Sequence, residues 1–267
     1  MEQTNVFKRK IYQEMLKWKE ERQGETALLI EGARRIGKST IVEEFAKNEY
    51  SSYILVDFSK TATEINNLFN DLSDLNYIFL RLQLNYNVSL KERKSLIIFD
   101  EVQNNPKARQ AIKHLVKDHR YDYIETGSLI SIRKNVQNII IPSEETRITM
   151  HPMDFEEFRW AMGDNVTFTL LKTVLEQKQP LGEATHRKLM RDFRLYMLVG
   201  GMPQAVDKYI KTNDLSAVDT VKRDIIALYE EDLRKIDTSG KATAMFDAIP
   251  SQLSKNASRY TISTVIP

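Results

Sequence analysis

Two glycines followed by a lysine and a serine form the residue set with the clearest chemistry in this sequence. The residues are Gly32, Gly37, Lys38 and Ser39, with four residues between the two glycines. Glycine permits backbone angles and close approaches that a Cβ atom would block, so successive N–H groups can curl around phosphate oxygens. The lysine ammonium can then bind the β- and γ-phosphates of a nucleotide, while the serine hydroxyl takes one coordination site on Mg²⁺.

The segments on either side of this loop have the pattern that this chemistry requires. The apolar run 27–30 predicts a short buried strand, and Ile41, Val42, Phe45 and Ala46 share one face of a predicted helix. Strand, glycine loop and helix in this order are the context of the Walker A motif, and the helix N-terminus adds its dipole. The residues that we expect to hold the nucleotide in this loop are Gly32, Ala33, Arg34, Arg35, Ile36, Gly37, Lys38, Ser39 and Thr40.

Two adjacent acids follow a second apolar run further along the chain. Residues 96–99 are all apolar and precede Asp100 and Glu101. An apolar run without alternation is typical of a central parallel strand that is buried on both faces. We expect Asp100 to hold Mg²⁺ and Glu101 to polarise an attacking water, as in a Walker B motif. The alternative is a strand that ends in solvated acids.

The segment 121–128 predicts a further strand that ends in hydroxyl groups. Thr126 is the first candidate, and Ser128 the second, for a contact with the γ-phosphate or the attacking water. The alternative for Thr126 is a hydroxyl that caps the following turn.

The other elements are predicted from periodicity and breaker residues. We expect strands at 53–58 and 146–150, a loop at 133–143, and helices at 5–22, 62–72, 74–88, 166–178, 184–199, 204–212 and 215–236. A helix that begins at Pro106 has an apolar face and a basic face, and we interpret the basic face as solvated rather than as a nucleic-acid contact. The basic residues are Lys107, Arg109, Lys113, Lys117 and Arg120.

Composition places few demands on the partner of this chain. The 267 residues are 42% hydrophobic and 28% charged, with a net charge of +2, which is ordinary globular composition. The absence of cysteine excludes disulfides and thiolate metal sites and fits a cytoplasmic location. We find no apolar run of the roughly 20 residues that a membrane helix needs, and no signal peptide, so no membrane partner is expected.

Taken together, the motifs resemble the AAA+ superfamily of P-loop ATPases. The resemblance is greatest to the stand-alone bacterial and archaeal ATPases with a helical and winged-helix C-terminal region of unknown function. It covers nearly the whole chain, and the matching stretches are 32–39, 97–103, 125–128, 150–158 and 199–203.

The resemblance implies an α/β fold, in which a parallel five-stranded P-loop NTPase sheet of order 5-1-4-3-2 is followed by an α-helical lid. The pattern becomes almost wholly helical from Asp154, where Glu157 completes a predicted capping box. We therefore expect an ATPase domain at 1–152 and a helical lid at 153–250. Residues 251–267 resemble the start of a truncated winged-helix unit.

The resemblance also implies roles for residues outside the two Walker motifs. Thr126 matches the sensor-1 residue, and Pro203 matches an element that lines the adenine side of the nucleotide in related NTPases. Arg147 is the leading arginine-finger candidate and Arg133 the second. The alternative for Arg147 is a structural ion pair.

The function expected from these residues is Mg²⁺-dependent binding and hydrolysis of ATP. The catalytic candidates are Lys38, Glu101, Thr126 and Arg147, and the metal ligands are Ser39 and Asp100. Nucleotide state would be coupled to an unidentified protein partner; DNA and a homo-oligomer remain open by analogy. The alternative is a nucleotide-binding switch with slow turnover. A small-molecule kinase is disfavoured, because a glutamate directly after the metal-binding aspartate suits water activation.

Overall fold

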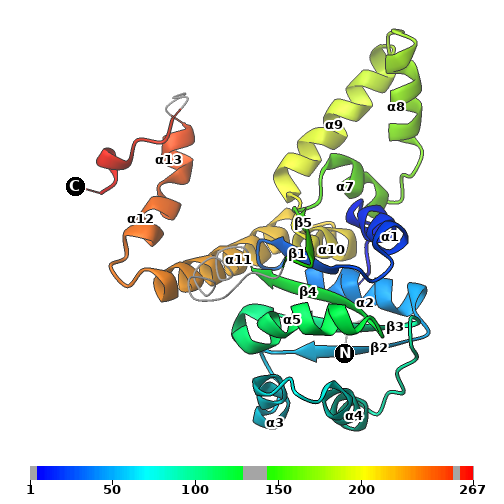
Figure 1. The fold of residues 1–267 in the computed structure, drawn as a ribbon. Coiled ribbons are helices and arrows are strands. Elements are labelled where there is room, and N and C mark those ends of the chain that lie inside the picture. Colours follow the sequence, from blue (N-terminus) through cyan, green and yellow to red (C-terminus); the bar gives the residue numbers. More distant parts are fainter. Residues whose placement is uncertain (1–4, 129–142, 255–258, 267) are drawn as a thin grey trace.

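The computed structural model describes residues 5–128, 143–254 and 259–266, and its centre is a five-stranded parallel sheet (Figure 1). The strands are β1 (Ala27–Gly32), β2 (Ser52–Asp57), β3 (Ser95–Asp100), β4 (Asp122–Ser128) and β5 (Glu145–Met150). Their order is β2-β3-β4-β1-β5, so the predicted order and the P-loop NTPase fold class are confirmed.

Helices cover both faces of this sheet. Apolar residues of α1 (Ile11–Arg22) and α2 (Lys38–Glu49) share a core with one face. Helices α3 (Thr63–Asn67), α4 (Leu75–Tyr86) and α5 (Pro106–Asp118) pack on the other face. All six residues of β3 are buried, as its unbroken apolar run predicted. Because the strands are parallel, the carboxyl ends of β1, β3 and β4 lie together at one end of the sheet.

The prediction of a helix over 5–22 was wrong at its start, because α1 begins at Ile11. The backbone N–H of Lys10 donates to Glu157 Oε1 at 2.7 Å, which satisfies one amide that no helical carbonyl could reach. Residues 5–9 are not helical, and Phe7 packs instead against the apolar core of the C-terminal helices. The expected helix 62–72 is also shorter, and consists of α3 and a 3₁₀ turn at Leu68–Asn70.

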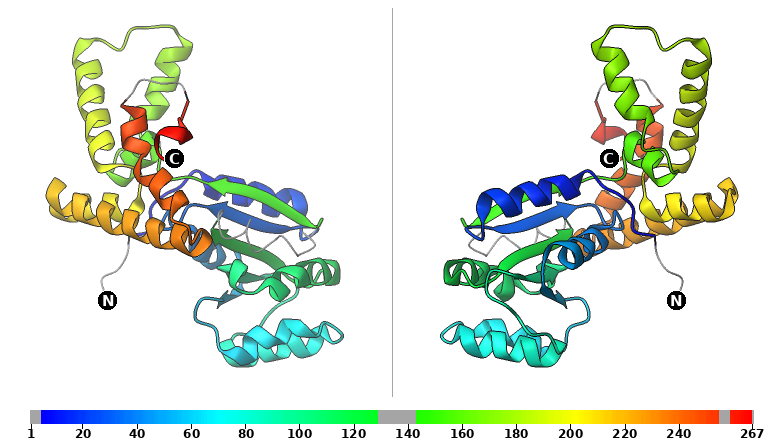
Figure 2. Two further views of the ribbon diagram at one scale, coloured as in Figure 1. Left: turned by 90° about the vertical axis from the view of Figure 1, so that its left-hand side faces the viewer. Right: turned by 90° about the vertical axis from the view of Figure 1, so that its right-hand side faces the viewer.

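The chain becomes helical after β5. The helices are α7 (Phe155–Ala161), α8 (Thr167–Glu176), α9 (Glu183–Val199), α10 (Pro203–Thr212), α11 (Leu215–Ile236), α12 (Lys241–Asp247) and α13 (Ile249–Leu253). The predicted capping box of Asp154 and Glu157 begins α7. The α8–α9 hairpin projects away from the sheet (Figures 1 and 2). The division at 152 and 250 stays a prediction.

Some expectations fall outside the described residues. These are Arg133, the predicted loop 133–143 except Ser143, and residues 255–258 of the expected winged-helix unit. Within the described part of the chain, no helix is long and apolar enough to cross a membrane.

Arg109 of α5 corrects the expected basic face of this helix. Its side chain is buried beneath the sheet, where Nη2 lies 2.9 Å from Glu145 Oε2 and Nη1 lies 3.9 Å from Glu125 Oε2. The spacing of apolar residues predicts which face of a helix is buried. It does not show that an arginine at the edge of that face pairs with buried carboxylates of other elements. Burial raises the pKa of the Glu125 carboxyl well above its ordinary value, and the charge of Arg109 opposes this rise.

Replacing Arg109 with Met should lower the free energy of unfolding by about 3–5 kcal/mol near pH 8, because two buried carboxyls lose their cation. The raised pKa of Glu125 means that the folded protein takes up a proton more readily than the unfolded chain, so stability falls as the pH rises above about 4.3. The deficit should therefore shrink from pH 8 to pH 5 in urea titrations. Lys113→Met, on the exposed face of α5, should change stability by less than about 0.5 kcal/mol. A deficit independent of pH would contradict this account.

Candidate functional site

The loop between β1 and α2 needs both of its glycines. Gly37 has φ 92°, a left-handed conformation that strains a residue with a Cβ atom. A Cβ atom on Gly32 would lie 2.3 Å from the carbonyl oxygen of Met150 on β5. Arg35 also has a left-handed φ of 66°. The loop is thus held in a curled form between β1 and α2, as phosphate binding requires.

Lys38 lies at the start of α2 with only 5% of its surface exposed. Its ammonium donates to the carbonyl oxygens of Gly32 at 3.1 Å and Ala33 at 2.8 Å. Burial lowers the pKa of Lys38, Glu101 and Asp100 oppose this, and the charge of Arg34 lowers it further. Neutral carbonyls compensate a buried cation poorly, so an anion entering the loop would relieve the desolvation.

Asp100 at the end of β3 accepts hydrogen bonds from two hydroxyls. Ser39 Oγ donates to Asp100 Oδ1 at 2.8 Å, and the Thr126 hydroxyl donates to the same oxygen. Adjacent parallel strands β3 and β4 bring Thr126 to this position. Thr126 is fully buried and accepts from the Glu101 N–H at 3.4 Å. The Thr126 hydroxyl therefore orients the Asp100 carboxylate from behind rather than lining the cavity.

The oxygen pair of Ser39 and Asp100 fits Mg²⁺. A hydroxyl and a carboxylate in hydrogen-bond contact are hard donors, and Mg²⁺ takes few protein ligands because it keeps several waters and binds substrate phosphates. The described residues contain no group of three or more histidine, cysteine or acidic side chains suited to a metal ion. A metal here would therefore depend on phosphate oxygens for the rest of its coordination.

Glu101 follows Asp100 and turns the chain away from the sheet. Its φ of 52° is left-handed, a conformation that costs energy outside glycine and recurs at functional sites. The side chain lines the same cavity as Lys38, and Gln103 Nε2 donates to its Oε2. A carboxylate oriented in this way can accept a proton from a bound water.

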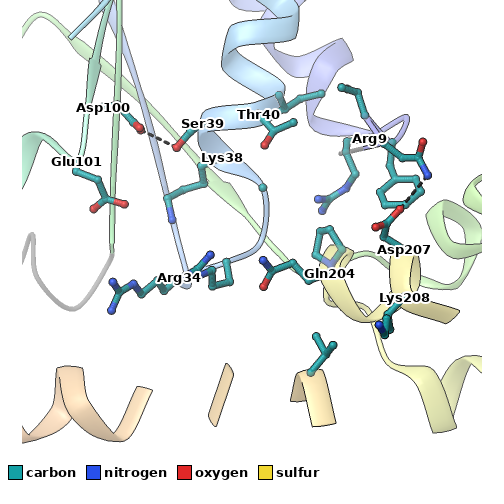
Figure 3. A pocket seen from close by; sticks show the side chains of 18 of the residues that line it. Arg9, Arg34, Lys38, Ser39, Thr40, Asp100, Glu101, Gln204, Asp207 and Lys208 are labelled. Carbon is teal, nitrogen blue, oxygen red and sulfur yellow. Dashed lines mark hydrogen bonds between the residues drawn. The ribbon is translucent and has the colours of Figure 1, made fainter. Parts of the chain in front are cut away.

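These groups line a cavity of about 770 Å³, which is the size of a small-molecule site. Figure 3 shows Lys38, Glu101 and Arg34 on one side of it, and Gln204 and Lys208 of α10 on the other. Seven cationic side chains and four carboxylates line it, so the cavity favours an anionic ligand. The cations are Arg9, Arg34, Arg35, Lys38, Lys60, Lys208 and Lys211, and the acids are Asp57, Asp100, Glu101 and Asp207.

The predicted nucleotide-binding residues divide into two groups. Those that line the cavity are Arg34, Arg35, Gly37, Lys38, Ser39, Thr40 and Pro203. Gly32 and Ala33 present carbonyls to Lys38, while the Ile36 side chain is buried in the core and anchors the loop. Arg147 does not line the cavity; its Nε lies 2.5 Å from Glu145 Oε1 on the same strand. This is the ion pair named as its alternative.

Arg9 is a residue of the site that sequence reasoning missed. Its side chain is buried, and its Nη1 donates to the Ile36 carbonyl in the loop at 2.9 Å. Its Nη2 donates to the His151 carbonyl after β5 at 2.5 Å, and Nε lies 3.2 Å from Glu157 of α7. No local pattern marks this arginine, since its partners lie far along the chain.

Helices of the C-terminal region also contact the loop directly. Arg34 Nη1 lies 2.9 and 3.0 Å from the two carboxylate oxygens of Asp232 on α11. The Tyr229 hydroxyl donates to the Arg34 carbonyl at 2.7 Å. At the start of α10, Pro203 Cγ would lie 3.7 Å from a Cβ atom on Gly37. The sequence marked Pro203 but gave no signal for Asp232 or Tyr229.

Replacing Arg9 with Met should lower the free energy of unfolding by about 3 kcal/mol, because Glu157 loses its buried cation and two carbonyls lose a charged donor. Chemical denaturation measures this. Lys8→Met is the matched control: Lys8 is exposed and lies 4.5 Å from the Trp160 ring centroid, so its loss should cost about 1 kcal/mol or less. Equal losses in the two variants would show that Arg9 does not brace the loop.

Two protein-family models match most of this chain. A family model described as "AAA domain" matches residues 24–159, and one described as a domain of unknown function (DUF8612) matches residues 190–266. A search of curated proteins found no match.

Solved structures that match this chain include two at low sequence identity. The Orc1 protein of Aeropyrum pernix, in complex with DNA, is 11% identical with a TM-score of 0.44, covering 98% of this chain and 82% of that one. PCH-2 of C. elegans is 11% identical with a TM-score of 0.40, covering 79% and 64%.

Proposed function

The chain belongs to the AAA domain family, and on that premise we propose that it binds ATP with Mg²⁺ and hydrolyses it at the cavity beside α2. The observation that supports this most is the buried ammonium of Lys38, which has carbonyl oxygens as its hydrogen-bond acceptors. It lies in one cavity with the Ser39–Asp100 oxygen pair and with Glu101.

Each of these side chains has a separate role in the proposal. Lys38 would bind the β- and γ-phosphates, and Ser39 and Asp100 would hold the metal ion. Bound Mg²⁺ would neutralise phosphate charge and orient the triphosphate. Glu101 accepts a proton from water as the water oxygen bonds to the γ-phosphorus. The bond from that phosphorus to the bridging oxygen breaks, and its electron pair leaves with ADP.

Two other residues assist in this proposal without touching the reacting atoms. Thr126 fixes the Asp100 carboxylate through its hydroxyl. Pro203 lies against Gly37 and lines the cavity, where it would contact the base or sugar of the nucleotide.

Replacing Glu101 with Gln should abolish phosphate release while nucleotide binding persists, because the amide keeps the shape but cannot accept the proton. We expect the rate to fall by at least about a hundredfold. Phosphate release and the Kd for ADP, measured with Mg²⁺, test this. Glu20→Gln, on the exposed face of α1, is the control and should match the wild type. Unchanged turnover in Glu101→Gln would remove this residue from the mechanism.

A switch with slow turnover is the second candidate function. It is favoured by the turn between α9 and α10, where Gly200 has φ 84° and Pro203 lines the cavity. Because the chain has no cysteine, single cysteines at exposed Lys117 and Ala227 can carry distance labels on α5 and α11. An identical label distance with ADP, with a non-hydrolysable ATP analogue and without nucleotide would exclude the switch.

We further propose a cytoplasmic location and coupling to a protein partner, with DNA and a homo-oligomer as alternatives. Phosphate release measured against protein concentration tests for the homo-oligomer. Specific activity that rises with concentration and is absent in Glu101→Gln would indicate a group supplied by a neighbouring copy. Activity independent of concentration would indicate that one chain holds the complete site.

A further inference from the structure

Arg34 lines the cavity, and its guanidinium is held by a carboxylate of α11. The side chain is 37% exposed, and its Nη1 lies within 3.0 Å of both oxygens of Asp232. The Tyr229 hydroxyl donates to its carbonyl at 2.7 Å. Two residues one turn apart on α11 thus fix both the backbone and the guanidinium of Arg34.

The guanidinium lies beside the groups that would surround a γ-phosphate. Arg34, Lys38 and Glu101 line one cavity, and Figure 3 shows their charged ends on the same side of it. The charge of Arg34 acts on the Lys38 ammonium and lowers its pKa, as expected for two cations that are close in space. The positive charges of Arg34 and Lys38 outnumber the single negative charge of Glu101, so this part of the cavity favours an anion.

We propose that the Arg34 guanidinium is the cation that stabilises the charge on the transferred phosphoryl group, and that Asp232 of the lid positions it. The proposal rests on the hydrolysis proposed above and names a catalytic residue for it in the same chain. In other NTPases a guanidinium in this role raises the rate by about 10³–10⁵-fold.

Asp232 can hold Arg34 without displacing a phosphate from it. A guanidinium has five donors in a rigid fork, and Asp232 engages Nη1. Among the described residues, no hydrogen bond involves its Nη2 or Nε. These nitrogens remain for phosphate oxygens, so Asp232 acts through Arg34 as a positioning residue.

Arg147, the arginine-finger candidate expected from the family resemblance, is less suitable for this role. Arg147 lies on β5, its Nε contacts Glu145, and it does not line the cavity. A role for Arg147 would require it to leave that pair and reach a phosphate from another direction or in another copy. Arg34 requires neither step.

Replacing Arg34 with Met tests the catalytic role. We expect kcat to fall about 10³-fold, with the Kd for ADP within about threefold of the wild type, because ADP lacks the γ-phosphate. Binding of a non-hydrolysable ATP analogue should weaken relative to ADP. Arg34→Lys keeps the charge and should retain more activity than Arg34→Met. Arg223→Met is the control, since Arg223 pairs with Asp219 on the exposed side of α11.

Replacing Asp232 with Asn tests the positioning role. We expect kcat to fall about tenfold to a hundredfold with unchanged ADP binding, because a misplaced guanidinium loses alignment with the phosphoryl group. Asp219→Asn on the same helix is the matched control and should match the wild type. Equal losses of ADP binding and thermal stability in Arg34→Met and Asp232→Asn, without a specific loss of kcat, would identify a structural brace and overturn the proposal.

The wild-type protein separates failure of this proposal from failure of hydrolysis itself. Wild-type turnover that persists in Arg34→Met within about threefold overturns the role of Arg34 and leaves hydrolysis intact. If the wild type binds ADP but releases no phosphate, hydrolysis is contradicted. The affinity ratio of ATP analogue to ADP then decides whether Arg34 contacts the γ-phosphate, and an unchanged ratio in Arg34→Met overturns that contact.

Discussion

The burial of the Lys38 ammonium is the constraint on which the rest of the site depends. Its hydrogen bonds go to two carbonyls, so the desolvation of the charge is only partly compensated. Asp100 and Glu101 supply the nearest opposing charge, from the end of a strand buried on both faces. The sheet core therefore maintains a cationic position that a phosphate would stabilise further, which is electrostatic preorganisation.

The loop around Lys38 is braced from three parts of the chain. Arg9 of the N-terminal segment donates to the Ile36 carbonyl, Tyr229 of α11 donates to the Arg34 carbonyl, and Pro203 of α10 lies against Gly37. The Ile36 and Arg34 carbonyls are therefore held by side chains that come from outside the loop. Helices α10 and α11 thus contact the same backbone that would bind phosphate.

The sequence predicts what local spacing determines and misses what long-range contact determines. The loop and the adjacent acids follow from motifs of a few residues in a fixed order, and the strand order follows from the family resemblance that these motifs carry. Arg9 and Asp232 have no such pattern, because their partners lie on other elements and appear only after folding. Arg109 was assigned to solvent for a related reason: periodicity detects apolar faces, whereas its burial depends on carboxylates of β4 and β5.

Hydrolysis and switching share one physical element in this chain, the contact between Arg34 and α11. If phosphate binds Arg34 more strongly with the lid in this position, occupancy of the site and the position of α11 are thermodynamically linked. Anything that displaces α11 then weakens the cation in the site, and a bound phosphate resists that displacement by the same free energy. The two candidate functions therefore differ in the rate of phosphoryl transfer relative to the movement of the lid, rather than in the architecture that performs them.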